Sequence, residues 1–251
     1  KSFERELHEA KERAEKANKK IELDLEIAKQ VQQGLYPDKI PEFEGVDIAA
    51  QIVQAQMVGG DYYDIIPVSE NRIALLVVDV AGHDLASAFI VGMAKISFSA
   101  YIPVYTSLVD IFENVNRDMQ KVIKSERFLS AFLAVIDTHT KTLTYAKAGH
   151  FKQLLYRSRS KTLELLETDG MLIGAFEDGM FRERQCHLDI GDKVFLYTDG
   201  LFENVNSARE QFGEERLHNF IMGHSDEAPY DLLNSIMKEE NEFREGVKPR
   251  D

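Results

Sequence analysis

The chain has 251 residues, of which 43 are acidic and 30 are basic, and its formal net charge is -13. A chain this acidic is a poor partner for nucleic acid or an anionic membrane surface, because phosphate recognition depends on clustered Lys and Arg. Its single cysteine excludes an intramolecular disulfide framework and a multi-cysteine zinc site. The apolar runs are too short to span a membrane and no signal peptide is visible, so we expect a cytoplasmic protein. Because the chain begins at Lys1, we also expect it to be part of a longer protein.

Residues 1–35 predict one long amphipathic helix, because apolar side chains recur mostly at spacings of three and four. These are Phe3, Leu7, Ala10, Ala14, Ala17, Ile21, Leu25, Ala28 and Leu35. Two interpretations stay open: a solvated linker helix, or a signalling helix that dimerises and joins an upstream sensor to the rest. Residues 1–33 hold eight basic and eight acidic side chains, so the net negative charge lies beyond them. Pro37 and Pro41 end the pattern, which predicts a second domain over residues 36–251.

The second domain is expected to mix strands and helices. Alternating or β-branched apolar segments predict strands over 46–53, 61–68, 72–80, 130–137, 142–148, 153–157, 162–166, 180–188 and 193–198. Helical periodicity predicts helices over 85–101, 107–124, 214–222 and 227–244. The strands are joined by short polar turns and the helices are grouped, so we predict an α+β layered sandwich with antiparallel sheets.

Several aspartates stand beside glycines or at the ends of apolar strands. Asp61 and Asp64 follow a glycine pair in VGGDYYD, Asp79 ends the run in LLVVDVAGH, Asp199 ends VFLYTDG, and Asp251 closes EGVKPRD. A carboxylate at the edge of a hydrophobic strand is costly to desolvate unless a cation or donor compensates it. Any one of these aspartates alone is most simply a turn or cap residue. Asp61, Asp79 and Asp199 together favour a site for Mg²⁺ or Mn²⁺, which prefer hard oxygen ligands.

At these residues the sequence resembles the metal-dependent serine/threonine phosphatases of the protein phosphatase 2C type. It is most similar to the bacterial branch that controls sigma factors by partner switching with anti-sigma factors. The segments that carry the resemblance are GGDYYD, VVDVAGHDLASAF, AKAGHFKQLLY, GMLIGAF and GDKVFLYTDGLFE, and they follow the family's order over about 200 residues. One such motif would be weak, whereas five in order are specific.

The resemblance implies a four-layer α/β/β/α sandwich with two central antiparallel sheets and two Mn²⁺ or Mg²⁺ ions at one end. Asp79 would bridge both ions and the carbonyl of Val80 would complete the shell of the second. Asp61 would bind the second ion and Asp199 the first. Asp251 matches the first member of the family's late Asp pair, and the second member and final strand lie beyond the 251 residues. The first ion would therefore be weakly held or absent.

The implied reaction is in-line attack on a phosphoserine or phosphothreonine by a metal-activated water. Asp79, Asp199 and His83 are the catalytic candidates, and His83 is preferred over His150 as a proton donor because it lies four residues from Asp79. For both histidines we favour a role in shaping a loop near the site. The chain has no G-x-S-x-G nucleophile elbow and no phosphate-binding P-loop. Cys186 lacks the arginine that a cysteine phosphatase requires six residues later.

The sequence also departs from the family pattern in three places. Asp84 stands where the family often has glycine, and Phe151–Lys152 replace a small-residue or proline stretch. The arginine that eukaryotic relatives place before the first acidic motif has no counterpart in IVQAQMVGGD. Phosphate would then be held mainly by the ions, with specificity supplied by protein docking.

Two functions follow as hypotheses. The first is a Mn²⁺- or Mg²⁺-dependent phosphatase that acts on a phosphorylated anti-sigma-factor antagonist, is controlled by an upstream sensor, and forms a homodimer through residues 1–35. The second is a catalytically weak or degenerate phosphatase fold that binds a signalling partner by docking alone. Metal uptake separates the two hypotheses.

Overall fold

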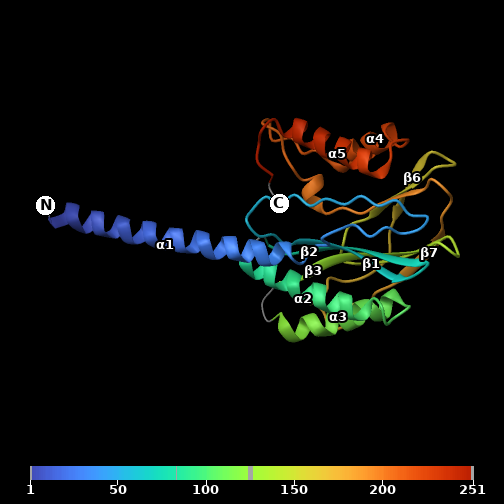
Figure 1. Ribbon diagram of the computed structural model, residues 1–251, viewed down its shortest axis with the longest axis horizontal. Coiled ribbons are helices and arrows are strands. Elements are labelled where there is room, and N and C mark those ends of the chain that lie inside the picture. Colours follow the sequence, from blue (N-terminus) through green and yellow to red (C-terminus); the bar gives the residue numbers. More distant parts are fainter. Residues whose placement is uncertain (1, 83, 124–126, 250–251) are drawn as a thin grey trace.

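The computed structural model describes residues 2–82, 84–123 and 127–249. Its body is a four-layer sandwich in which two antiparallel sheets lie face to face between two pairs of helices, and a long N-terminal helix extends from one end (Figure 1). The predicted α+β four-layer architecture is confirmed.

The two sheets divide the strands unequally. The larger sheet has the strand order β1-β2-β3-β4-β7, and its members are β1 (Asp61–Ser69), β2 (Arg72–Val80), β3 (Leu129–Asp137), β4 (Thr142–Ala148) and β7 (Glu183–His187). The smaller sheet has the order β6-β5-β8, and its members are β5 (Gln153–Arg157), β6 (Thr162–Leu166) and β8 (Lys193–Phe195). Neighbouring strands pair antiparallel throughout.

The helices cover the two outer faces. They are α1 (Ser2–Gln33), α2 (Leu85–Tyr101), α3 (Leu108–Val122), α4 (Glu214–Gly223) and α5 (Pro229–Arg244), with a short 3-10 turn η1 at Asp199–Leu201. Helices α2 and α3 lie on the larger sheet, and α4 and α5 lie beyond the smaller one (Figure 1). Asp84 caps α2 and Ser107 caps α3 through their side-chain oxygens.

Three apolar cores hold the layers together. One joins α2 and α3 to the larger sheet and contains Phe98, Phe112 and Leu133. A second lies between the two sheets, around Phe132 and Leu155, and a third joins the smaller sheet to α4 and α5. Strand β3 contributes to the first two cores because its alternate side chains face opposite sides of the sheet, which explains why eight of its nine residues are buried.

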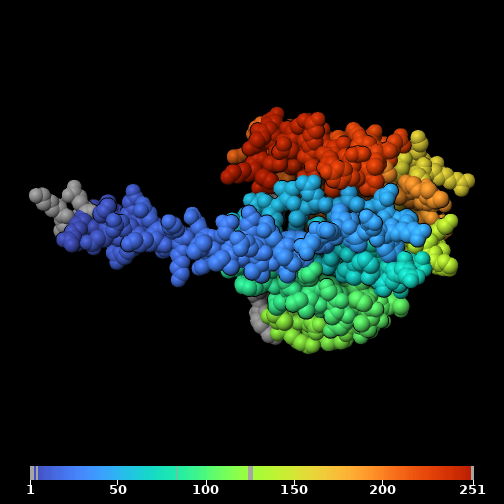
Figure 2. Space-filling model, in the orientation of Figure 1, coloured from blue at the N-terminus to red at the C-terminus, as the bar shows by residue number. Residues whose placement is uncertain are grey.

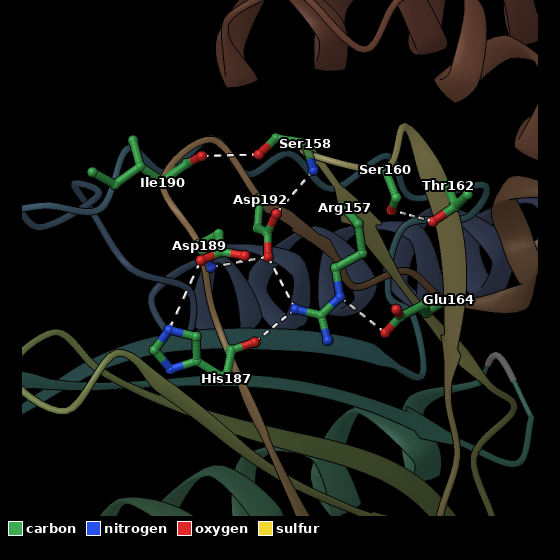
Figure 3. A network of polar contacts seen from close by, with 9 residues as sticks. All are labelled: Arg157, Ser158, Ser160, Thr162, Glu164, His187, Asp189, Ile190 and Asp192. Carbon is green, nitrogen blue, oxygen red and sulfur yellow. Dashed lines mark hydrogen bonds and ion pairs between the residues drawn. The ribbon is translucent and has the colours of Figure 1, made fainter.

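A partly buried ion pair between Arg157 and Asp192 fastens the smaller sheet to the connection between β7 and β8 (Figure 3). The Arg157 guanidinium donates to Asp192 Oδ2 at 3.0 Å and to the His187 carbonyl at 2.6 Å. Asp192 also accepts the backbone N–H groups of Ser158, at 2.9 Å, and Asp189, at 3.1 Å. The side chain of Asp192 is only 2% exposed, and these donors compensate the desolvation of its charge.

The predicted strand over 46–53 is wrong. That segment makes only an isolated bridge between Phe43 and Val46, and its apolar residues Ile48 and Ala50 pack against the core between the sheets. The alternation of apolar and polar residues in 46–53 therefore reflects packing against the core and not pairing with a neighbouring strand. The predicted strands over 180–188 and 193–198 exist but are shorter, because β7 spans Glu183–His187 and β8 ends at Phe195.

Helix α1 projects well beyond the body and is exposed over most of its length (Figures 1 and 2). The structure confirms that most of residues 1–35 form one long helix. The assignment of this helix as a separate signalling domain stays a prediction. Within the described residues, no helix has both the length and the apolar character needed to cross a membrane.

Candidate metal centre

Asp61 and Asp79 lie directly opposite each other on neighbouring strands. Asp61 begins β1 and Asp79 is the penultimate residue of β2, and the register of the antiparallel pair makes them Cα partners. Directly opposed side chains of an antiparallel pair share one face of the sheet with Cβ atoms about 5 Å apart. Both residues are half-buried. The structure thus brings together two of the three aspartates that the sequence analysis grouped.

Gly60 opens space for backbone carbonyls beside this pair. A Cβ atom at Gly60 would lie 2.4 Å from the Val80 carbonyl oxygen and 2.7 Å from that of Gly82, so no other residue fits here without movement. The Val80 N–H donates to the Gly60 carbonyl at 3.1 Å, and the Ala81 N–H, in the peptide that carries the Val80 carbonyl, donates to the Phe128 carbonyl at 3.0 Å. Two carboxylates beside a crowded set of carbonyl oxygens are a donor set suited to Mg²⁺ or Mn²⁺.

The segment that carries Asp199 contacts Asp61 through Thr198, the residue before Asp199. Thr198 Oγ1 donates to Asp61 Oδ2 at 2.6 Å, and Asp199 then begins η1. Among the described residues, no three His, Cys, Asp or Glu side chains form a group able to hold a metal ion, so Asp199 does not complete the set as it is placed. His83 and Asp251, the other two candidates, lie outside the described residues.

Residues 69–251 match the family described as Stage II sporulation protein E (SpoIIE). The chain belongs to the SpoIIE family. Over 183 residues, 73% of this chain, it is 30% identical to the phosphoserine phosphatase RsbU of Bacillus subtilis. That match covers 54% of RsbU, so the chain spans about half the length of this relative.

Solved structures show the same fold. The SiaA-PP2C domain of Pseudomonas aeruginosa superposes with a TM-score of 0.77 and 21% identity, over 94% of this chain and 95% of that one. RsbX, solved in complex with magnesium, superposes with a TM-score of 0.56 and 16% identity, over 76% of this chain and 83% of that one. At these identities the likeness establishes the fold, which is that of the PP2C phosphatases.

Asp64, which the sequence places near Asp61, faces away from the centre of this SpoIIE-family domain. Residues three apart on a strand point to opposite faces, so Asp64 lies on the side covered by α2. There it accepts a hydrogen bond from the Tyr62 hydroxyl and forms an ion pair with Lys95 at 3.3 Å. Burial raises the pKa of Tyr62 well above its usual value, so the phenol stays protonated and donates. Asp64 therefore ties β1 to α2.

His150 is buried and fully occupied by hydrogen bonds. Its Nδ1 lies 2.7 Å from Ser130 Oγ, and its Nε2 lies 3.2 Å from the Tyr197 carbonyl oxygen. Burial lowers the pKa of His150 to about 4, so the ring is neutral at physiological pH. These contacts agree with the expected loop-shaping role and give the ring no free nitrogen with which to protonate a leaving group.

Arg127 is a residue near the centre that the sequence analysis missed. Its guanidinium contacts Asp84 at 2.6 Å, Ser87 Oγ at 2.7 Å and the Ala81 carbonyl at 3.3 Å. The hydrogen bonds from Arg127, followed by the Ser87 N–H, lower the pKa of Asp84 to about 2. Asp84, which departs from the family pattern, therefore caps α2 and secures Arg127 against the 81–82 loop. No local pattern around Arg127 signals this long-range contact.

The end of α1 is fastened to the residues that precede Asp61. The buried amide of Gln32 donates to the Gly59 carbonyl at 2.7 Å and accepts the Gly59 N–H at 3.0 Å. Tyr36, just after α1, donates its hydroxyl proton to the Asp61 carbonyl at 2.9 Å. Gln54 Nε2 donates to Gln32 Oε1 at 3.1 Å and to the Tyr36 hydroxyl at 3.0 Å. The backbone on both sides of Gly60 is thus held by the N-terminal helix and its extension.

Proposed function

We propose that the chain is a Mn²⁺- or Mg²⁺-dependent protein phosphatase that hydrolyses phosphoserine or phosphothreonine. The observation that carries the proposal is the opposed pair Asp61 and Asp79 beside the crowded carbonyls at Gly60. Membership of the SpoIIE family and the likeness to the phosphoserine phosphatase RsbU support it.

The residues proposed to hold divalent ions are Asp61, Asp79, the carbonyl of Val80, Asp199 and Asp251. A divalent ion supplies Lewis acidity there, which lowers the pKa of water and neutralises charge on the phosphoryl oxygens. The chain's own residues orient the ligands. Thr198 donates to the Oδ2 atom of Asp61 and so helps to orient this carboxylate, as outer-shell hydrogen bonds do in metal sites.

The proposed substrate is a phosphorylated anti-sigma-factor antagonist. A phosphate held mainly by ions gives little selectivity by itself, so selectivity must come from docking of the protein that carries it. The net charge of -13 also disfavours recognition of isolated anionic phosphoesters at a distance. Turnover is therefore expected on a folded phosphoprotein far more than on a small phosphoester.

We further propose that an upstream sensor controls the domain through α1 and that two copies associate along this helix. Gln32 and Tyr36 bond the backbone of residues 59–61, so a movement of α1 would displace the backbone that carries Asp61. The apolar side chains of α1 that stay exposed in one copy are the surface for association, and they include Phe3, Leu7 and Ile21.

Replacing Asp79 by Asn tests the catalytic proposal. The amide keeps the size of the side chain but removes the charge that would hold the ions, so Mn²⁺-dependent phosphate release from a phosphoserine protein should fall by about a thousandfold or more. Asp226→Asn is the matched control, because Asp226 is an exposed aspartate in the loop between α4 and α5. Full activity in Asp79→Asn would refute the proposal, and absence of Mn²⁺ uptake by the wild type would favour the docking module.

A further inference from the structure

A chain of hydrogen bonds crosses between the two sheets at the end of the sandwich where Asp79 lies. It runs from the Ser130 hydroxyl on β3 through the His150 ring to the carbonyl of Tyr197, just after β8. All three residues are buried, and His150 is 1% exposed. Such an arrangement has no solvent to replace a lost partner, so each bond constrains position strongly.

The Tyr197 carbonyl determines which atoms donate and which accept in this series of hydrogen bonds. A carbonyl oxygen can only accept, so His150 Nε2 carries the proton and donates it to the Tyr197 carbonyl. The neutral ring then presents a lone pair at Nδ1, which accepts the Ser130 hydroxyl proton. The lowered pKa of His150 keeps the ring in this neutral form at physiological pH. The bridge is therefore a fixed structural element under those conditions.

The two ends of the bridge lie beside the proposed metal ligands. Ser130 is the Cα partner of Asp79 in the β2–β3 register, and Asp79 is the partner of Asp61, so the three form one row across three strands. At the other end, Tyr197 stands two residues before Asp199. The bridge thus joins the sheet that carries Asp61 and Asp79 to the segment that carries Asp199.

That segment depends on side chains for its position. Strand β8 ends at Phe195, so the backbone of Tyr197 lies beyond the regular ladder. The Gln153 side chain takes over there: its Oε1 accepts the Tyr197 N–H at 2.7 Å, and its Nε2 donates to the Tyr197 carbonyl at 3.2 Å. Gln153 belongs to the same small sheet, whereas His150 connects the segment to β3. The His150 bridge therefore relates the segment to the opposite sheet.

From this geometry we infer that Ser130 and His150 are positioning residues for the metal centre, which hold the Asp199 segment at a set separation from Asp61 and Asp79. The inference rests on the proposed function. To share an ion with Asp61 and Asp79 on the larger sheet, Asp199 in η1 has to approach them, so loosening the bridge that relates its segment to that sheet weakens the binding of the ion without removing any ligand.

Calorimetric titration with Mn²⁺ tests the inference. Ser130→Ala removes the hydroxyl that donates to His150, and the apparent Mn²⁺ affinity should fall by about tenfold. Ser130→Thr keeps the hydroxyl and should keep the wild-type affinity. Ser97→Ala is the matched control, because Ser97 is also buried and bonds Asp118 at 3.1 Å but lies on α2; its Mn²⁺ affinity should equal that of the wild type.

Kinetics gives a second readout that a general loss of stability would not produce. In Ser130→Ala, kcat should fall at limiting Mn²⁺ and recover at excess Mn²⁺, with KM for the phosphoprotein unchanged. Wild-type Mn²⁺ affinity in Ser130→Ala would overturn the inference, and so would an equal loss in Ser97→Ala. If the wild type itself took up no Mn²⁺, the proposed function would fail, and this inference with it.

Discussion

At the scale of single residues, Asp192 lies in different surroundings from the opposed pair Asp61 and Asp79. Asp192 is surrounded by N–H donors that satisfy its charge within the protein. Asp61 accepts one hydroxyl from Thr198 and faces Asp79 across the strand pair. Two carboxylates in direct opposition repel each other, and a divalent cation relieves that repulsion. We therefore propose Asp61 and Asp79 as metal ligands, whereas Asp192 is a structural carboxylate.

Replacing Asp192 by Asn should destabilise the fold by about 2 kcal/mol, because Arg157 then loses one of its two carboxylate partners and keeps only Glu164, at 2.9 Å. Urea unfolding at pH 7 measures the change in free energy. Asp189→Asn, in the same loop but exposed, serves as the control and should change stability by less than about 0.5 kcal/mol. An equal loss in both variants would contradict the role assigned to the Arg157–Asp192 pair.

The same pair gives stability a defined pH dependence. Burial alone would raise the pKa of Asp192, but the Ser158 and Asp189 amides and the Arg157 guanidinium outweigh it and hold the pKa below its usual value. A carboxyl whose pKa is lower in the folded chain stabilises the fold above the unfolded pKa and loses that effect as pH falls through the folded value. The stability gap between wild type and Asp192→Asn should therefore be full at pH 7 and smaller at pH 3.

At the scale of elements, the strands and helices with strong local patterns were predicted well. The bounds of β2, α2, β4, β5 and β6 match the predicted ranges to the residue. Their periodicity comes directly from burial on one or both faces, which is a local signal. The segment 46–53 has a similar pattern but makes only the isolated bridge between Val46 and Phe43. Strand β8 stops early because the Gln153 side chain replaces the ladder at Tyr197.

The candidate site was predictable only in part. Glycines and strand ends marked Asp61, Asp79 and Asp199 in the sequence, and the structure places the first two opposite each other. The side chains that position these residues carry no local mark, because Gln32 and Arg127 act across 27 and 46 residues respectively. Contacts of this length depend on the finished tertiary fold, which single-sequence patterns do not contain.

Helix α1 yields a prediction about coupling. Gln32→Ala removes both hydrogen bonds to Gly59, so Mn²⁺-dependent activity should change by about fivefold or more while the helix itself stays formed. Gln33→Ala is the matched control, since Gln33 is the next residue of α1 and is exposed. Steady-state phosphate release with circular dichroism as a check on helicity measures the effect. Identical activity in the two variants would rule out this route of control.

A second prediction concerns association along α1. Leu7 and Ile21 are exposed apolar residues on the predicted seam, so Leu7→Lys combined with Ile21→Lys should convert a dimer to a monomer. Analytical ultracentrifugation measures the mass. Ile190→Lys is the control, because Ile190 is 93% exposed on the connection between β7 and β8. A wild-type chain that is monomeric at all accessible concentrations would contradict the dimer.

At the scale of the whole molecule, the four layers place the proposed centre where the two sheets meet at one end. Asp61 and Asp79 come from the larger sheet, and Asp199 follows the last strand of the smaller one. The excess negative charge lies beyond residue 33, in the part that forms this sandwich. We propose ion binding for only a few of those carboxylates, and the others belong to the framework and the solvated surface.

Anomalous scattering from a crystal of the protein grown with Mn²⁺ tests the central claim most directly. We expect a Mn²⁺ peak within coordination distance of both Asp61 and Asp79, with the Val80 carbonyl directed toward it. A peak at another site, or none beside Asp61 and Asp79 at saturating Mn²⁺, would contradict the assignment of this pair as the metal centre of a phosphatase.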